Sequence, residues 1–305
     1  MSDEPKSTPQ KPEQPPATER LAKVMAEHGV ASRREAEKIV TDGRVEVNGA
    51  VVTHPGTPVS RSDTIRVDGR PLPTAPRKIY LLFYKPKGTI VTRADPEGRD
   101  TIWQILPELP ARVEAVGRLD VNTEGALLLT NDGDLANALT HPSREVPKRY
   151  LAKVWKEPSE SDLKRLMSGV LLEDGKTAPC KARVVRLAQG RPGSEARQPG
   201  ESNCWVEITV TEGKNRLVRR MLTAIGHPVS KLRRESFATV SIRDLAPGQL
   251  RPLTAEEIDR VRDVSQGVIP SAAGRRSRSR KMGHAKADPG WIQRRENRKK
   301  KPRRA

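Results

Sequence analysis

The sequence GRLDVNTEGALLLTNDGD, at residues 117–134, decides how the rest of the chain is interpreted. Gly117 and Gly125 give the backbone on either side of Asp120 the freedom that a loop closing on a ligand needs. The apolar run at 126–129 is too short for an independent helix and too apolar for a surface loop. It therefore predicts a buried strand or the start of a buried helix.

Asp120 lies between this glycine-rich turn and the apolar run. A carboxylate held against a packed apolar element has its position and its pKa set by its surroundings, so Asp120 is a candidate nucleophile or general base. The alternative is that Asp120 only caps the helix that follows. The local pattern leaves both interpretations open.

The composition favours a polyanionic partner. The chain has 305 residues, enough for more than one domain, with 34% hydrophobic and 31% charged residues and a formal net charge of +19. Residues 271–305 hold 14 Lys or Arg against Asp288 and Glu296, and the preceding residues are also net basic. A polyanionic partner is therefore favoured over a membrane surface. No stretch approaches the ~20 apolar residues of a membrane span, and the start resembles no signal peptide.

Cysteine use predicts neither a metal nor a cofactor. Cys180 and Cys204 are the only cysteines, and no CxxC or HxxxH pattern accompanies them. A structural zinc site typically takes about four ligands at short spacings, so we expect none here. Two reduced, ordinary thiols in a cytoplasmic protein are the simpler interpretation.

The N-terminal part predicts a small unit of its own. Residues 1–17 are rich in proline and contain little to bury, which predicts a disordered leader. A helix is expected from residue 19 to about 28. Ser32 and Glu35 have the spacing of a capping box for a second helix that ends near Gly43, and an Asn-Gly hairpin turn is expected at 48–49.

Arg33 and Arg34 lie in the first turn of that second helix. Positive charge at a helix start opposes the macrodipole, which favours an external anion such as phosphate as the partner of these side chains. A solvated basic face is the alternative.

The later segments predict a sheet with helices. Residues 70–77 are expected to be a linker, 93–103 a loop leading to core residues at 103, 105 and 106, and 189–203 a hairpin tip. Strands are expected at 79–84, 148–155, 170–172, 181–187 and 204–210, with a strand end at Gly213, and helices at 135–140, 159–169, 216–225 and 256–264. Tyr150, at a strand start, is either structural or functional on position alone. The arginines of 216–220 either border a cleft or cover a surface.

Residues 117–133 resemble, without a gap, the active-site motif of the rRNA pseudouridine synthases of the RsuA/RluB type. The sequences KPKG at 85–88, KRY at 148–150 and EGKNRLVRRM at 212–221 resemble further motifs of that family, in the family's order. Residues 18–66 resemble the S4 RNA-binding domain, a module that many proteins use.

The resemblance implies a role for each matching residue. Asp120 would be the catalytic nucleophile, Tyr150 would stack on the target base, and Arg219 would pair with the carboxylate. The implied substrate-pocket residues are Arg118, Lys148 and Leu232, and the implied RNA-binding residues are Arg33, Arg34, Lys38, Lys214 and Arg216.

The implied fold class is α+β, with an S4 domain of the αL type and its linker at 18–75. A pseudouridine synthase domain with a mostly antiparallel sheet flanked by helices would follow at 76–264, and a disordered basic tail at 265–305. The implied enzyme is a cytoplasmic monomer that needs no cofactor. It would isomerise a flipped-out uridine in rRNA, naked or in an assembling ribosomal subunit.

The long cationic tail favours large-subunit rRNA and the RluB type over a small-subunit enzyme. From another class, a non-catalytic S4-type RNA-binding protein of ribosome assembly is the alternative. The interpretation of the first two helices as a DNA-binding module is less favoured, because nothing in the sequence indicates a symmetric dimer or a base-reading helix.

Overall fold

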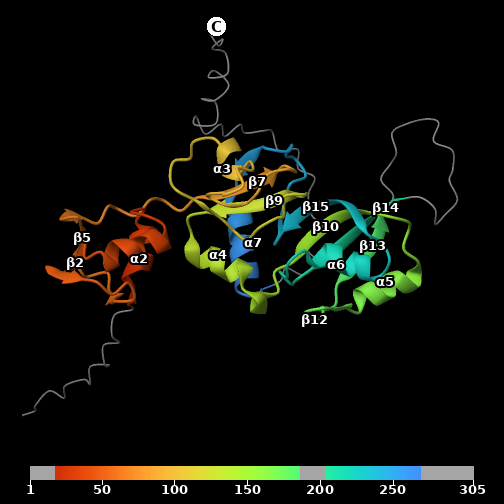
Figure 1. The fold of residues 1–305 in the computed structure, drawn as a ribbon, viewed down its shortest axis with the longest axis horizontal. Coiled ribbons are helices and arrows are strands. Elements are labelled where there is room, and N and C mark those ends of the chain that lie inside the picture. The colour runs from red at the N-terminus through yellow and green to blue at the C-terminus, as the bar shows by residue number, and fades with distance from the viewer. Residues whose placement is uncertain (1–17, 186–202, 269–305) are drawn as a thin grey trace, which may run out of the picture. The chain divides into compact units, whose positions relative to one another are not determined.

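The computed structural model describes residues 18–185 and 203–268 (Figure 1). The chain divides into two compact units, with the boundary between Arg77 and Lys78. The leader expected at 1–17, most of the tip expected at 189–203 and the tail beyond 268 lie outside the described residues. Within the described ranges, no helix is long and apolar enough to cross a membrane.

The first unit contains the two predicted helices, α1 (Leu21–Glu27) and α2 (Arg33–Thr41). The capping box of α2 is confirmed: the Ser32 hydroxyl accepts from the Glu35 amide, and the Glu35 carboxylate accepts from the Ser32 amide at 2.8 Å. The helices bury one apolar face against a small sheet. The strands of this unit are β1 (Glu19–Arg20), β2 (Val45–Val47), β3 (Ala50–Val52), β4 (Pro58–Val59), β5 (Ile65–Val67) and β6 (Arg70–Pro71).

The predicted hairpin joins β2 to β3, and both residues of its turn, Asn48 and Gly49, have positive φ angles of 53° and 83°. This is the combination that an Asn-Gly turn provides. The expected linker at 70–77 is shorter than predicted, because its first two residues form β6 and pair with β5.

The second unit is built on a nine-stranded sheet with the main order β13-β14-β10-β15-β9-β7-β17. All pairings in it are antiparallel except that of β9 with β15, which is parallel. The predicted α+β class with a mostly antiparallel sheet is therefore confirmed. The strands are β7 (Tyr80–Lys85), β8 (Glu114–Ala115), β9 (Thr123–Thr130), β10 (Lys148–Val154), β13 (Lys181–Val185), β14 (Cys204–Val210), β15 (Val229–Phe237), β16 (Val240–Ser241) and β17 (Leu250–Pro252).

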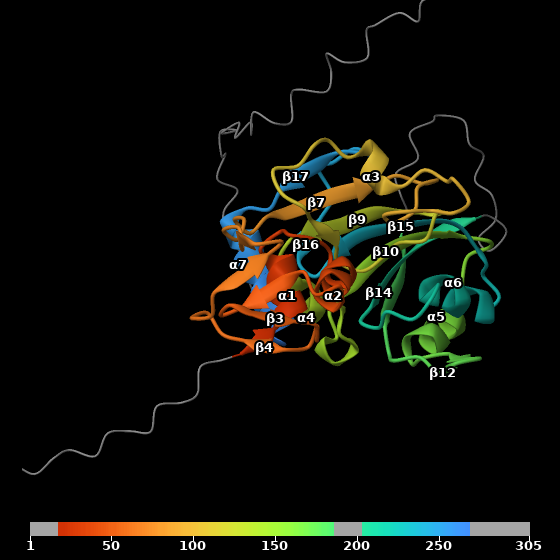
Figure 2. The same cartoon turned by 60° about the vertical axis from the view of Figure 1, so that its left-hand side comes forward.

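Helices cover both faces of this sheet (Figures 1 and 2). On the β7 and β9 half, α4 and α7 share one apolar cluster and α3 borders another. On the β10 and β14 half, α5 and α6 close a third cluster. The bounds are α3 (Ile102–Ile105), α4 (Gly133–Thr140), the 3-10 turn η1 (Pro142–Arg144), α5 (Glu160–Met167), α6 (Leu217–Ala224) and α7 (Ala255–Ser265), and the small hairpin β11 (Leu171–Leu172) and β12 (Gly175–Lys176) lies beside α5 and α6.

The apolar run of the central motif is the middle of strand β9, so of the two predicted possibilities the strand is correct. Ala126 and Leu128 belong to the cluster of α4 and α7, whereas Leu127 and Leu129 belong to the cluster of α3. A strand buried on both faces has no polar alternation, which is why its sequence is continuously apolar.

Gly125 is required by the parallel contact of β9 with β15. Its φ is +117°, and a Cβ atom built on it would lie 2.2 Å from the backbone oxygen of Arg234, its partner on β15. Any side chain would force the two strands apart.

Three local predictions were wrong. The segment expected to remain a loop to residue 103 contains helix α3, where the Gln104 side chain accepts from the Thr101 amide at 2.7 Å. Ile105, expected in the core, is 37% exposed, while its neighbour Leu106 is buried as expected. The strand expected at 204–210 is β14, but the strand end expected at Gly213 lies at Val210.

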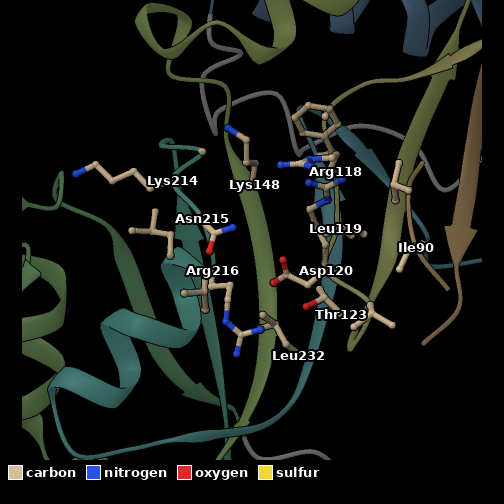
Figure 3. Close-up of a pocket in the computed structure, with 18 of the residues that line it drawn as sticks. Ile90, Arg118, Leu119, Asp120, Thr123, Lys148, Lys214, Asn215, Arg216 and Leu232 are labelled. Carbon is tan, nitrogen blue, oxygen red and sulfur yellow. The ribbon is translucent and has the colours of Figure 1, made fainter. Parts of the chain in front are cut away.

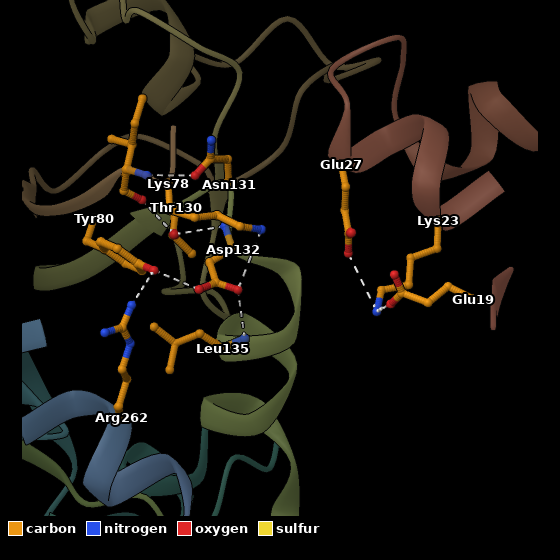
Figure 4. A network of polar contacts seen from close by, with 11 residues as sticks. Glu19, Lys23, Glu27, Lys78, Tyr80, Thr130, Asn131, Asp132, Leu135 and Arg262 are labelled. Carbon is orange, nitrogen blue, oxygen red and sulfur yellow. Dashed lines mark hydrogen bonds and ion pairs between the residues drawn. The ribbon is translucent and has the colours of Figure 1, made fainter. Parts of the chain in front are cut away.

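A polar network joins α7 to the start of the unit (Figure 4). The Tyr80 hydroxyl on β7 donates to Asp132 at 2.7 Å and accepts from Arg262 of α7 at 3.1 Å. Asp132 is also the N-cap of α4 and accepts from the Leu135 amide. The Asp132 carboxylate thus connects β7 to α4, and the Tyr80 hydroxyl links both to α7.

We expect Gly125→Ala to destabilise the second unit by more than about 3 kcal/mol, because the new Cβ overlaps backbone that cannot move without breaking the sheet. The matched control is Gly248→Ala, where φ is +86° and no atom lies within 4 Å of the built Cβ. It should cost only the ~1 kcal/mol of left-handed backbone. Urea unfolding of both variants measures the difference, and equal destabilisation would contradict the steric argument.

Candidate active site

A pocket of about 640 Å³ opens in the second unit beside the central motif (Figure 3). It is bordered by residues 90–99, the motif segment before β9, the loop after β14, and strands β10 and β15. Of the residues predicted from sequence, those that line it are Arg118, Asp120, Lys148, Tyr150, Lys214, Arg216 and Leu232. Arg219 lies behind this lining, and Arg33, Arg34 and Lys38 belong to the first unit.

The sheet register brings the floor of the pocket together. Tyr150 on β10 lies directly opposite Arg234 on β15. Leu232, two residues before Arg234, is on the same face of the strand and lies opposite Thr123 at the start of β9. Side chains from distant parts of the sequence thus meet on one surface.

Asp120 is held in the loop that enters β9. Its carbonyl accepts from the Thr123 amide at 3.0 Å, and the Gly88 amide donates to the carbonyl of Val121 at 2.8 Å. Since the segment after Asp120 is a strand and α4 is capped by Asp132, the helix-cap alternative for Asp120 is wrong. The half-buried carboxylate points into the pocket, with Arg216 across from it (Figure 3).

Arg219 on α6 reaches the same loop through the backbone. Its guanidinium donates to the carbonyl of Asn122 at 2.9 Å and to that of Val229 at 3.2 Å. In the described part of the chain it forms no direct ion pair with Asp120, although the charge of Asp120 acts on it favourably. Burial, together with Arg216, lowers the pKa of Arg219. Arg219 therefore ties the Asp120 loop to the start of β15.

Lys85 is a contact of this loop to which the sequence gave no role. It is fully buried at the end of β7, and its ammonium donates to the carbonyls of Thr123 at 2.9 Å and Pro86 at 3.0 Å. Burial lowers the pKa of Lys85 to about 8, while Asp120 and Glu124 favour its charged form. The sequence feature that pointed to this contact was a lysine at the end of an otherwise apolar and aromatic strand.

Lys148 and Arg234 place two more cations at the pocket. The ammonium of Lys148 donates to the carbonyls of Val146 at 3.0 Å and Thr211 at 2.9 Å, and burial with the neighbouring Arg234 lowers its pKa to about 8. Arg234 lines the pocket, and the sequence gave it no role either.

Arg216 adopts the left-handed conformation, with φ at +47°, immediately before α6. This conformation is uncommon for residues other than glycine and is often found at functional sites. It places Asn215 and Arg216 on the side of the pocket that faces Asp120 (Figure 3).

The pocket is basic, and its described lining contains no histidine or cysteine that would serve as a metal ligand. The carboxylates among the lining residues are Asp95, Asp120 and Glu212. The cations are Arg99, Arg118, Lys148, Lys214, Arg216 and Arg234. Such an excess of positive charge around one central carboxylate suits a polyanionic substrate.

Comparison with known proteins identifies the family. Residues 79–224 match the family model described as RNA pseudouridylate synthase, and residues 19–65 match the S4 domain. The ribosomal large subunit pseudouridine synthase B of Bacillus subtilis is 44% identical over 247 residues, which cover 81% of this chain and 97% of that protein. The chain belongs to the RNA pseudouridine synthases.

Other relatives of this pseudouridine synthase agree. An uncharacterised RNA pseudouridine synthase of Aquifex aeolicus is 42% identical over 241 residues, covering 78% of this chain and 92% of its own. A crystal structure described as a pseudouridylate synthase superimposes with a TM-score of 0.55 at 29% identity, covering 79% of this chain and 99% of its own. The family and the two modules implied by the sequence motifs are thereby confirmed.

Lys85 should make the free energy of unfolding of the synthase depend on pH in the alkaline range. Its pKa is about 8 in the folded protein against 10.5 in the unfolded chain. Between these values the unfolded state binds more protons, so the stability contributed by Lys85 rises with pH. We expect the free energy of unfolding of the wild type, relative to Lys85→Met, to increase from pH 7 to pH 10.

Urea unfolding at several pH values measures this difference, and the neighbouring exposed Lys87, as Lys87→Met, is the matched control. The control should differ from the wild type by the same amount at each pH. A pH-independent difference for Lys85→Met would contradict the assignment of a burial-lowered pKa.

Proposed function

We propose that this synthase converts a uridine of ribosomal RNA, in the large subunit, into pseudouridine. The observation that carries the proposal is the Asp120 carboxylate pointing into a basic pocket whose floor carries Tyr150. The S4 module supports an RNA substrate. The Bacillus subtilis relative, named for the ribosomal large subunit, supports this choice of RNA.

In the proposed reaction the N1–C1′ bond of the uridine breaks, uracil turns, and C5 joins C1′. The proton leaves C5 and N1 gains one, so the product is an isomer and no oxidant or energy source is consumed. Asp120 acts as the nucleophile on the target nucleotide. The uridine is flipped out of its stack, because its atoms cannot be reached inside it.

The neighbouring residues position the nucleophile and the base. Arg219 and Lys85 hold the Asp120 loop by donating to its backbone carbonyls, and they place positive charge close to the carboxylate. Tyr150 stacks on uracil and takes part in removing the C5 proton, and Leu232 packs against the base. Arg118, exposed at the rim, projects towards the RNA and fills the vacated stack.

Further basic residues bind the RNA backbone. On the S4 unit these are Arg33, Arg34 and Lys38, which are exposed or partly exposed, and beside the pocket they are Lys214 and Arg216. The 14 lysines and arginines of 271–305 add salt-sensitive affinity that does not depend on sequence. We propose that the enzyme acts in the cytoplasm as a monomer, on naked rRNA or an assembling large subunit.

Asp120→Asn should abolish turnover, because an amide is no nucleophile, yet leave RNA affinity within about twofold, since phosphate contacts dominate binding. The measurement is tritium release from rRNA labelled at uracil C5. Asp174→Asn is the matched control, because Asp174 pairs with Arg220 outside the pocket. Product formation by Asp120→Asn would refute the assignment. If the wild type released no tritium from naked rRNA or from assembling subunits, the synthase function itself would fail.

Tyr150→Phe separates stacking from proton removal. The ring remains, so RNA affinity should be unchanged. Loss of the hydroxyl should slow tritium release about 100-fold if the phenol oxygen accepts the C5 proton. Tyr150→Leu, which also removes the stacking surface, should be slower still. A Tyr150→Phe enzyme as fast as the wild type would restrict Tyr150 to stacking.

A further inference from the structure

Arg234 is a buried cation without an acidic partner in the described part of the chain. Its side chain is 3% exposed, and its Nε donates to the carbonyl of Ala126 at 2.7 Å. Its Nη2 has no hydrogen-bond partner among the described residues. Burying a charge is costly unless it is paired, so a buried guanidinium with an idle donor indicates a missing ligand.

The surroundings of Arg234 increase this cost. Lys85 and Lys148 both lie within reach of its charge, and Arg234 contributes to lowering the pKa of each. The ring of Phe237 lies 4.8 Å from the guanidinium carbon and offers only a partial compensation. Three cations thus gather beside the pocket that holds Asp120.

The strand register fixes where the ligand of Arg234 would lie. Arg234 lines the pocket and is the direct cross-strand neighbour of Tyr150. Opposite residues on one face of a sheet have Cβ atoms about 5 Å apart. A base stacked on the Tyr150 ring would therefore present one of its edges to Arg234.

The proposed reaction produces a negative charge, and Arg234 lacks a negatively charged partner. When the N1–C1′ bond breaks with its electron pair on N1, negative charge spreads from N1 over the O2 and O4 atoms of uracil. A donor already positioned at such an oxygen stabilises the transition state more than the bound uridine.

We propose that Arg234 donates to a carbonyl oxygen of the flipped uracil and stabilises the negative charge that forms as the glycosidic bond breaks. This inference rests on the proposed function. A uracil oxygen suits Arg234 better than a phosphate, because Arg234 is buried in the floor, whereas the exposed Arg118 and Arg216 stand at the rim.

The test compares Arg234→Met and Arg234→Lys with the wild type in single-turnover tritium release from rRNA. Arg234→Met should be slowed about 100-fold, with Arg234→Lys between it and the wild type. RNA affinity and its salt dependence should stay unchanged. The matched control is the neighbouring Arg233, which points to the opposite face and pairs with Glu235. Arg233→Met should react within about twofold of the wild type.

A second measurement probes the substrate atom without changing the protein. Once the wild type has located its uridine, fragments carrying 2-thiouridine or 4-thiouridine at that position replace one oxygen by a poorly accepting sulfur. The wild type should be slowed by one of the two. Arg234→Met should not be slowed further by that same substitution, because the contact is already lost.

Several outcomes would overturn the role of Arg234. One is a folded Arg234→Met enzyme as fast as the wild type. Another is a fall of about 0.7 in its salt slope, which would assign Arg234 to a phosphate. Equal wild-type rates on the uridine, 2-thiouridine and 4-thiouridine fragments would overturn the role of Arg234, even if the Arg234 variants do not fold. A wild type inactive on every rRNA would overturn the proposed function and this role together.

Discussion

The parallel contact between β9 and β15 is the constraint on which the catalytic unit depends. It joins the strand that follows the Asp120 loop to the strand that carries Leu232 and Arg234. The two backbones approach closely only because position 125 is a glycine. Gly125, inside β9, therefore shapes the surroundings of Asp120 through the sheet.

Backbone carbonyls, rather than carboxylates, hold four of the cations in and beside the pocket. Lys85, Lys148, Arg219 and Arg234 each donate to main-chain oxygens, and none forms an ion pair within the described ranges. Their positive charges are held in fixed positions but are not neutralised by carboxylates. A site built in this way is organised before the substrate arrives, so little reorganisation is needed when charge develops during the reaction.

Local chemistry made much of the fold predictable. The capping box at Ser32, the turn at Asn48 and the apolar run of β9 each depend on a few adjacent residues. Motifs of the family located Asp120 and Tyr150. Arg234 could not be found in this way, because an arginine in a strand, here one of two adjacent arginines, normally faces solvent. Its hydrogen-bond partner Ala126 is 108 residues away in the sequence, and no local sequence pattern predicts a parallel strand contact across that separation.

The first and last strands of the catalytic unit, β7 and β17, are antiparallel neighbours, and Tyr80 near its start contacts Arg262 near its end. The chain thus enters and leaves this unit at nearly one point. A module with adjoining ends can be fused to different RNA-binding partners on either side, or have its ends joined and reopened elsewhere, without stretching the sheet.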